Sequence, residues 1–196
     1  MVSLSENANE LLGVGLYTPS EAARLARVRT QTFNRWLYGS DQGDALLTPR
    51  YDEINQDRVV TFWDLIQAVA VRNLRSSSLG AKLSLPKIRE TIKHAKDEYG
   101  LNFPLAKRHT LYVFDRRLII HVNGEYIGTE RGTDRGQIYQ GRIIEPFLEE
   151  VKFDDNEMAE QWKPLTSKNY SVSLNASRRF GLPVIEPEGV LVSALV

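Results

Sequence analysis

Residues 17–38, YTPSEAARLARVRTQTFNRWLY, constrain the fold most, because they predict two short helices joined by a tight turn. Thr18 and Glu21 have the spacing of a capping box, in which each side chain accepts a hydrogen bond from the other residue's backbone amide. Pro19 falls at the first helical position, where its missing N–H costs nothing. Apolar residues then recur at helical spacing and predict a buried face, formed by Ala22, Leu25 and Ala26.

The second helix of this pair has one apolar face, and its other side chains suit DNA. Thr30 is the expected N-cap. Four arginines and no acidic residue lie between Arg24 and Arg35, so this stretch carries a local charge of +4. Arginine pairs with guanine or phosphate, and Gln and Asn pair with adenine. The pattern favours a DNA-binding helix-turn-helix over a helical hairpin with a solvated face. The positions expected to be buried are Phe33, Trp36 and Leu37.

Residues 39–58 predict a wing, a short hairpin that follows the helix-turn-helix and touches DNA with Arg50 and Tyr51. Thr61 and Asp64 repeat the capping-box spacing and predict a helix that is buried on more than one side. Another helix is expected from Ser84 to its glycine stop at Gly100.

The hydrophobic period changes near residue 111, where strands are expected. Residues 111–114, 118–122 and 126–127 have strand patterns, and the Asn123-Gly124 pair is a hairpin signal. Residues 137–151 predict a helix interrupted by Pro146. Residues 171–196 predict an extended β segment with too little material for its own core, for which a partner chain is a candidate support.

Composition excludes several classes of protein. The chain has no cysteine, which excludes disulfides and thiolate metal sites, and its three histidines lack ligand spacing. It contains no P-loop, no nucleophile elbow, no signal peptide, and no apolar run near the roughly 20 residues of a membrane span. We therefore expect a cytoplasmic protein that is not an enzyme, with no cofactor, no bound metal and no membrane contact. An acidic cluster is interpreted as a solvated helix start rather than a cation site: Asp154, Asp155, Glu157 and Glu160.

Charge is unevenly distributed along a chain whose net charge is zero. Residues 82–108 carry seven basic and three acidic residues, a net charge of +4. Residues 130–163 carry five basic and nine acidic residues, a net charge of −4. This distribution fits either DNA at one end and another partner at the other, or an ordinary mixed surface.

Most of the chain resembles a family of prokaryotic VapB-type antitoxins, which join a MerR-like helix-turn-helix to a small C-terminal module of unknown function. The resemblance lies in residues 13–25 (GVGLYTPSEAARL), 144–148 (IEPFL) with the following Phe153-Asp154, and 177–185 (SRRFGLPVI). It implies an autorepressor that binds operator DNA and neutralises a toxin, usually a PIN-domain ribonuclease. In this family pattern, recognition-helix roles fall on Arg29, Thr30, Thr32 and Arg35.

Together these observations predict an α+β fold. A mostly helical, MerR-like winged helix-turn-helix domain is followed by a small antiparallel β-hairpin and helix region and an extended β C-terminus. The expected divisions are a flexible tail at 1–15, the DNA-binding domain at 16–100, a dimerisation or partner region at 101–163, and a partner-binding segment at 164–196.

The main functional hypothesis is a homodimeric repressor and antitoxin, with double-stranded operator DNA and a toxin as partners. The alternatives are a MerR-like regulator that responds to a ligand, and an adaptor without DNA binding. The predicted DNA-binding residues are Thr18, Arg27, Arg29, Thr30, Gln31, Thr32, Asn34, Arg35, Arg50 and Tyr51. The predicted partner-binding residues are Arg178, Phe180, Val184, Ile185, Val190 and Val192.

Overall fold

The structure is a computed structural model that describes residues 14–41, 43–54, 56–76, 83–108, 111–114, 117–122, 124–128 and 151–195. Four α-helices lie in these residues: α2 (Pro19–Leu25), α3 (Thr30–Tyr38), α4 (Phe62–Arg75) and α5 (Leu85–Tyr99). Three antiparallel sheets accompany them, so the expected α+β class is confirmed. No helix of the described residues is long and apolar enough to cross a membrane.

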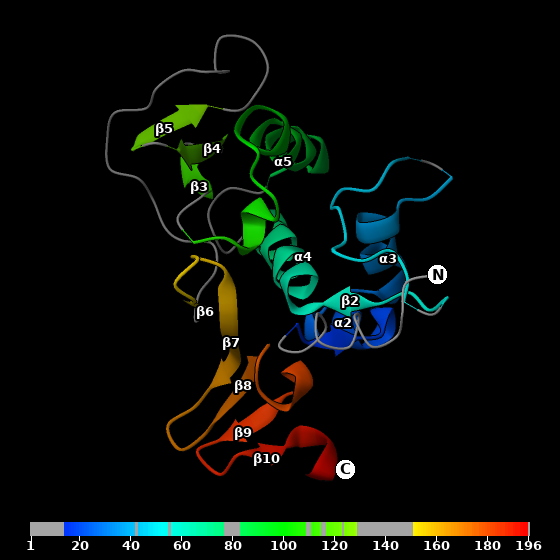
Figure 1. The fold of residues 1–196 in the computed structure, drawn as a ribbon, viewed down its shortest axis with the longest axis vertical. Coiled ribbons are helices and arrows are strands. Elements are labelled where there is room, and N and C mark those ends of the chain that lie inside the picture. Colours follow the sequence, from blue (N-terminus) through cyan, green and yellow to red (C-terminus); the bar gives the residue numbers. More distant parts are fainter. Residues whose placement is uncertain are drawn as a thin grey trace.

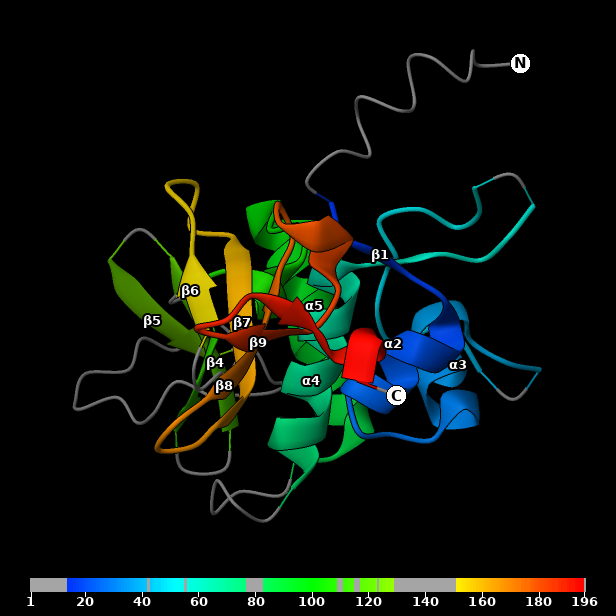
Figure 2. The same ribbon diagram turned by 90° about the horizontal axis from the view of Figure 1, so that it is seen from below.

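Helix α4 lies between the α2–α3 pair and the strands of residues 111–128 and 151–166 in both views, while the short strands at 16–17 and 60–61 lie on the α2–α3 side (Figures 1 and 2). It begins with the predicted capping box, because the Asp64 amide donates to the Thr61 hydroxyl and the Thr61 amide donates to the Asp64 carboxylate at 2.9 Å. The prediction of burial on more than one side is confirmed. The fully buried apolar side chains of α4 are Phe62, Leu65, Ile66, Ala68, Val69, Ala70, Val71 and Leu74.

The α2–α3 pair has the predicted start but a different second cap. The Thr18 amide donates to the Glu21 carboxylate at 2.8 Å, and α2 begins at Pro19 as expected. The prediction of Thr30 as the N-cap of α3 is wrong. Arg29 holds that position with an extended backbone and no side-chain hydrogen bond, and Thr30 is already helical. An N-cap needs non-helical dihedral angles, so the Thr30 hydroxyl is one residue too late.

The predicted wing is also wrong. The described residues of the stretch 39–58 form only two isolated bridges, Ser40–Gly43 and Ile54–Asp57, and no strand ladder. Leu46 and Leu47 instead donate their amides to the Trp36 carbonyl at 2.8 Å each, which ties the segment to the end of α3. The strand that follows, β2 (Val60–Thr61), pairs with β1 (Leu16–Tyr17) at the start of the chain's described part.

The three-stranded sheet has the predicted order. It consists of β3 (Leu111–Phe114), β4 (Arg117–Val122) and β5 (Glu125–Gly128), all antiparallel, and Gly124 directly precedes β5. Helix α5 packs against β4, and the 3₁₀ turn η2 (Pro104–Ala106) packs against α4 and α5. The helix predicted at 137–151 falls outside the described residues except for Val151, which begins a strand.

The C-terminal part forms a five-stranded meander, and the expectation that its last strands need a partner for support is corrected. Strands β8 (Ser171–Asn175), β9 (Val184–Glu186) and β10 (Val190–Leu191) pair in turn beside β7 (Ala159–Thr166) and β6 (Val151–Phe153). The predicted boundary between residues 163 and 164 falls inside β7. The Trp63 indole of α4 donates to the Ala159 carbonyl at 3.0 Å, and Trp162 and Leu174 join the common core.

The acidic cluster at 154–160 is not a helix start. It lies at the turn between β6 and β7 and on β7, where the Asp154 carboxylate accepts from the amides of Asn156 at 2.9 Å and Met158 at 2.8 Å. An aspartate that accepts from nearby backbone amides stabilises a turn. No group of three potential metal ligands occurs in the part of the chain that the structure describes.

Candidate functional site

The turn between α2 and α3 is tight and strained. Arg27 has a φ of +54°, in the left-handed region that disfavours residues with a Cβ atom. The Val28 amide donates to the Ala23 carbonyl at 3.0 Å, which closes α2 in the manner of a Schellman motif, where glycine is usual. Such strain persists only where surrounding contacts fix the backbone.

Arg72 of α4 provides one of these contacts. Its guanidinium donates to the Ala26 carbonyl at 3.0 Å and to the Asn73 side chain at 2.9 Å. Burial, and then the nearby charge of Arg27, lowers the pKa of Arg72. Arg72 therefore holds the α2–α3 turn from the side of α4, while the Arg27 side chain of the turn is exposed to solvent.

The buried face of α3 determines which of its side chains reach solvent. Phe33, Trp36 and Leu37 lie in the core as predicted. Gln31 and Arg35 are exposed and lie one helical turn apart on the same side. Arg29 and Thr30 are exposed at the helix start, where no side chain caps the amides and no acidic residue occurs in the first turn. A helix N-terminus of this kind favours anions.

Three other predicted DNA-binding residues of this pair are less available. The Thr18 hydroxyl bonds to the Glu21 carboxylate at 2.7 Å, so it is used within the capping box. Thr32 is half-buried. Asn34 is also half-buried, and its Oδ1 atom is buried with no hydrogen-bond partner. The predicted DNA-binding residues of the pair that remain exposed are therefore Arg27, Arg29, Thr30, Gln31 and Arg35, and Arg24 of α2 is exposed as well.

Arg50 and Tyr51 lie together, but against α4. The Arg50 guanidinium stacks over the Trp63 ring at 4.5 Å and the Tyr51 ring at 5.5 Å, and the Arg50 amide donates to Asp64 at 3.1 Å. Both residues are half-buried. Stacking on two aromatic rings gives Arg50 a packing role that the sequence pattern did not predict.

A second unusual surface lies in the turn after β8. Arg179 and Phe180 both have left-handed φ angles, +53° and +56°, and Phe180 is 74% exposed. Gly181 follows with a φ of +79°, and its carbonyl accepts from the Tyr17 hydroxyl at 2.6 Å. A Cβ atom at Gly181 would collide with that hydroxyl, and burial raises the pKa of Tyr17. The turn is thus fixed to the N-terminal part of the protein.

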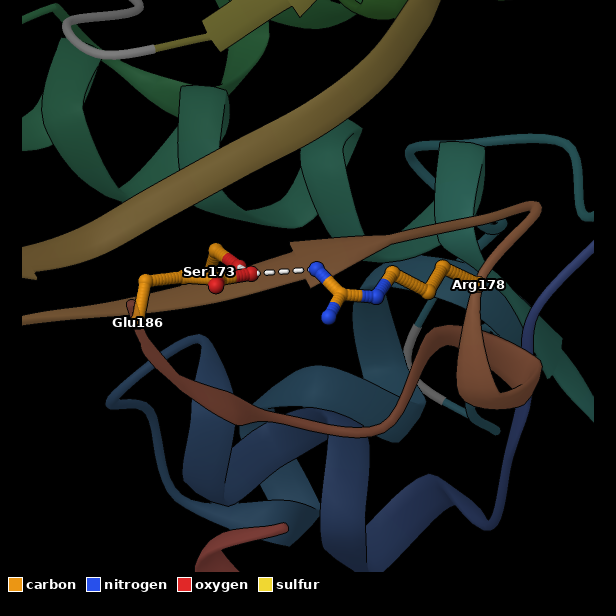
Figure 3. Close-up of polar contacts among 3 residues, drawn as sticks. All are labelled: Ser173, Arg178 and Glu186. Atoms are coloured by element: carbon orange, nitrogen blue, oxygen red, sulfur yellow. Dashed lines mark hydrogen bonds and ion pairs between the residues drawn. The ribbon is translucent and has the colours of Figure 1, made fainter. Parts of the chain in front are cut away.

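An ion pair fixes the other side of this turn. The Glu186 carboxylate of β9 accepts from Arg178 at 2.5 Å and from the Ser173 hydroxyl of β8 at 3.2 Å (Figure 3).

The remaining residues that were predicted to bind a partner differ in burial. Val184 is only 3% exposed, so it is removed from the predicted partner surface, whereas Val190 is 39% exposed. Ile185 and Val192 are half-buried.

The fold belongs to the mixed α+β class, with a helical pair near the N-terminus and antiparallel sheets after it. Neither a protein-family model nor a curated protein matches this chain. Among solved structures, it is similar to the crystal structure of Rv2018 from Mycobacterium tuberculosis, with a TM-score of 0.61 and 19% identity over 94% of this chain and 86% of that one. At this identity the likeness concerns the fold alone.

Proposed function

We propose that this protein is a DNA-binding autorepressor of the antitoxin type, in which α2 and α3 act as a helix-turn-helix and α3 enters the major groove. The observation that carries the proposal is the exposed surface of Arg27, Arg29, Thr30, Gln31 and Arg35 around an uncapped helix start. This surface supplies donors to phosphates at the helix end and side chains for base edges along the helix.

The orientation of α3 supports the same proposal. Because Phe33, Trp36 and Leu37 are buried, α3 cannot rotate without exposing its core face. Gln31 and Arg35 are then the pair best placed to read adenine and guanine. Two copies in a homodimer would read half-sites about 34–36 Å apart, one turn of DNA.

A titration by fluorescence anisotropy tests this function. The full-length protein is added to labelled DNA from upstream of its own gene and to scrambled DNA, at several salt concentrations. We expect tight, sequence-dependent binding and a steep salt dependence. Arg35→Ala should weaken specific binding by roughly 1–3 kcal/mol. Lys93→Ala, at an exposed lysine of α5, is the control with the same change in charge. Equal weak binding to both DNAs would refute the proposal.

We also propose that the turn formed by residues 178–181 is the anchor for a protein partner. In the family pattern, this partner is a PIN-type ribonuclease toxin. An aromatic side chain that is 74% exposed on a strained but firmly held turn supports this role. Binding hot spots are enriched in aromatic and arginine anchors, and a pre-organised anchor loses little entropy on binding.

The partner proposal is tested with a PIN-type ribonuclease encoded beside this gene, as the proposed family pattern expects. Phe180→Asn keeps a residue that tolerates the left-handed conformation and removes the ring. We expect it to weaken toxin binding by about 2 kcal/mol or more without lowering the stability of the protein. Tyr170→Ala removes another exposed aromatic ring and is the control. Unchanged toxin inhibition by Phe180→Asn would exclude the anchor.

A further inference from the structure

The C-terminal sheet carries an exposed apolar surface. Among the residues that the structure describes, the large hydrophobic side chains that are exposed all lie between positions 165 and 190: Leu165, Tyr170, Phe180 and Val190. Figure 1 shows β8, β9 and β10 at one end of the longest axis of the molecule, below the α-helices in that view. Apolar side chains that gather in one part of a protein surface are a mark of an interaction site.

Two of these side chains belong to an unbroken apolar row across four strands. Leu165 of β7 pairs with Val172 of β8, which pairs with Ile185 of β9. Ile185 pairs in turn with Val190 of β10. Residues directly opposite each other on neighbouring strands share a face of the sheet. The four side chains therefore form one row, here called the aliphatic row, which spans three strand spacings or about 14 Å.

The core covers one end of this sheet face and leaves the aliphatic row open. Leu174, two positions after Val172 on the same face of β8, is fully buried in the core. Leu165 and Val190, at the two ends of the row, are 43% and 39% exposed. Val172 and Ile185 between them are half-buried. The row is thus an apolar extension of the core face that the described residues do not cover.

The turn proposed as the anchor for a toxin is held on the other face of the sheet. Ser173 and Glu186 directly follow Val172 and Ile185 in their strands, so their side chains point to the opposite face. There Glu186 accepts from Ser173 and from Arg178 (Figure 3). A molecule on the aliphatic row therefore leaves the ion pair of the anchor turn in place, and the row needs an occupant of its own.

The charges beside the row indicate that this occupant is a second copy of the chain. Lys168 lies in the turn between β7 and β8, and Glu188 lies in the turn between β9 and β10. Strands β7 and β9 run in the same direction, because each is antiparallel to β8, so both turns lie at the same end of the sheet. Both side chains are exposed, and within the described part of the chain no ion pair involves either of them.

We propose that the aliphatic row is the interface of a homodimer, in which two copies pack sheet against sheet around a two-fold axis parallel to the strands. This axis places Leu165 of each copy over Val190 of the other. It also places the β7–β8 turn of each copy over the β9–β10 turn of the other, so Lys168 faces Glu188 at two symmetric positions. Sheets packed in this aligned way lie about 10 Å apart. A two-fold axis across the strands would instead place these turns at opposite ends of the dimer.

The short row predicts a dimer that dissociates on dilution. A standard stable interface buries roughly 800 Å² on each partner, which is more than a sheet face with a row of about 14 Å provides. Two half-sites on one DNA molecule would hold the two copies together by raising their effective concentration. This link to DNA rests on the proposed function, whereas the dimer itself forms without DNA.

Sedimentation velocity of the full-length protein, without DNA and over a range of concentrations, measures the dissociation constant of the dimer. We expect an equilibrium between monomer and dimer. Leu165→Asp places an unpaired charge in the apolar interface and should raise the dissociation constant roughly 100-fold or more. Thr166→Asp is the matched control, because Thr166 is the next exposed residue of β7 and lies on the other face. It should dimerise like the wild type.

Charge reversal tests the orientation of the two copies. Lys168→Glu and Glu188→Lys each replace two attractions by two repulsions, and each should raise the dissociation constant roughly threefold to tenfold at low salt. The double variant should return it to the wild-type value, because both pairs form again with reversed charges. All of these positions are exposed, so the variants keep the fold, which circular dichroism verifies.

Three results would overturn the interface. These are a protein that stays monomeric at its highest soluble concentration, undiminished dimerisation of Leu165→Asp, and a double charge reversal that dimerises no better than the single ones. The anisotropy titration then separates the interface from the proposed function. A protein that dimerises through the row but binds no DNA refutes the proposed function and leaves the interface standing. If Leu165→Asp binds the upstream DNA as tightly as Thr166→Asp, the link between the dimer and DNA binding fails.

Discussion

Replacing Arg27 by glycine should stabilise the protein and weaken its binding to DNA at the same time. Arg27 is exposed and has a φ of +54°, so its side chain contributes little packing while its backbone is strained. The left-handed conformation costs a residue with a Cβ atom roughly 1–2 kcal/mol. Glycine removes that cost but adds about 0.5–1 kcal/mol through its greater freedom in the unfolded chain. The difference between the two is a net gain of roughly 0.7 kcal/mol, within a range of about 0–1.5 kcal/mol.

Arg27→Ala is the matched control, because it removes the same guanidinium and keeps the strained Cβ atom. Urea unfolding of the wild type and both variants measures the free energy of unfolding. We expect Arg27→Ala to be close to the wild type and Arg27→Gly to be more stable than both. If Arg27→Gly is no more stable than Arg27→Ala, the argument from backbone strain is refuted.

The DNA measurement separates the role of the side chain from that of the backbone. In the proposed complex with DNA, Arg27 contacts a phosphate and each variant removes that contact, so both should lose affinity equally and reduce the slope of log affinity against log salt by about 1. Backbone strain of this kind is concentrated at functional sites, which makes Arg27 the residue of this turn to test. Unchanged affinity in both variants would remove Arg27 from the DNA surface.

Three further changes test other contacts. Tyr17→Phe leaves the Gly181 carbonyl without its donor and should lower the free energy of unfolding in urea by about 1–3 kcal/mol; an unchanged midpoint would contradict the contact between the two ends of the chain. Asp64→Ala removes the carboxylate half of the capping box of α4, which accepts from the Thr61 amide and hydroxyl, and also the acceptor of the Arg50 amide. It should cost about 1–3 kcal/mol in the same assay, and a smaller loss would argue against the role of this carboxylate. Hydrogen bonds from Thr18 lower the pKa of Glu21 in the folded protein. The Glu21 carboxylate therefore stabilises the fold at a pH above the pKa of the unfolded chain, which is about 4.3. This stabilisation is lost as the pH falls through the lower pKa of the folded protein. The stability difference between the wild type and Glu21→Gln should therefore shrink between neutral pH and pH 3, and a constant difference would exclude this linkage.

The sequence predicts those parts of the fold that depend on neighbouring residues. Both capping boxes, at Thr18 and Thr61, form as expected because each involves residues only three positions apart. The strands on the two sides of the predicted hairpin signal, β4 and β5, likewise pair in the antiparallel manner that the signal predicts. The N-cap of α3 was misplaced by one residue, because a hydroxyl in sequence does not show which residue leaves the helical conformation.

Contacts between distant residues were not predictable from local patterns. Arg72 binds the Ala26 carbonyl across 46 positions, and Tyr17 binds the Gly181 carbonyl across 164 positions. The segment predicted as a wing binds the Trp36 carbonyl instead of pairing with itself. Val184 was predicted to contact a partner, but its side chain is buried. Successive side chains of a strand point to opposite faces, so apolar residues that are adjacent in sequence cannot all face a partner.

Helix α4 connects the α2–α3 turn to the rest of the protein. Asp64 in its first turn accepts from the Arg50 amide, and Arg72 in its last turn donates to the Ala26 carbonyl of the α2–α3 turn. Since apolar side chains on every side of α4 are buried, the helix cannot shift at one end without moving its neighbours.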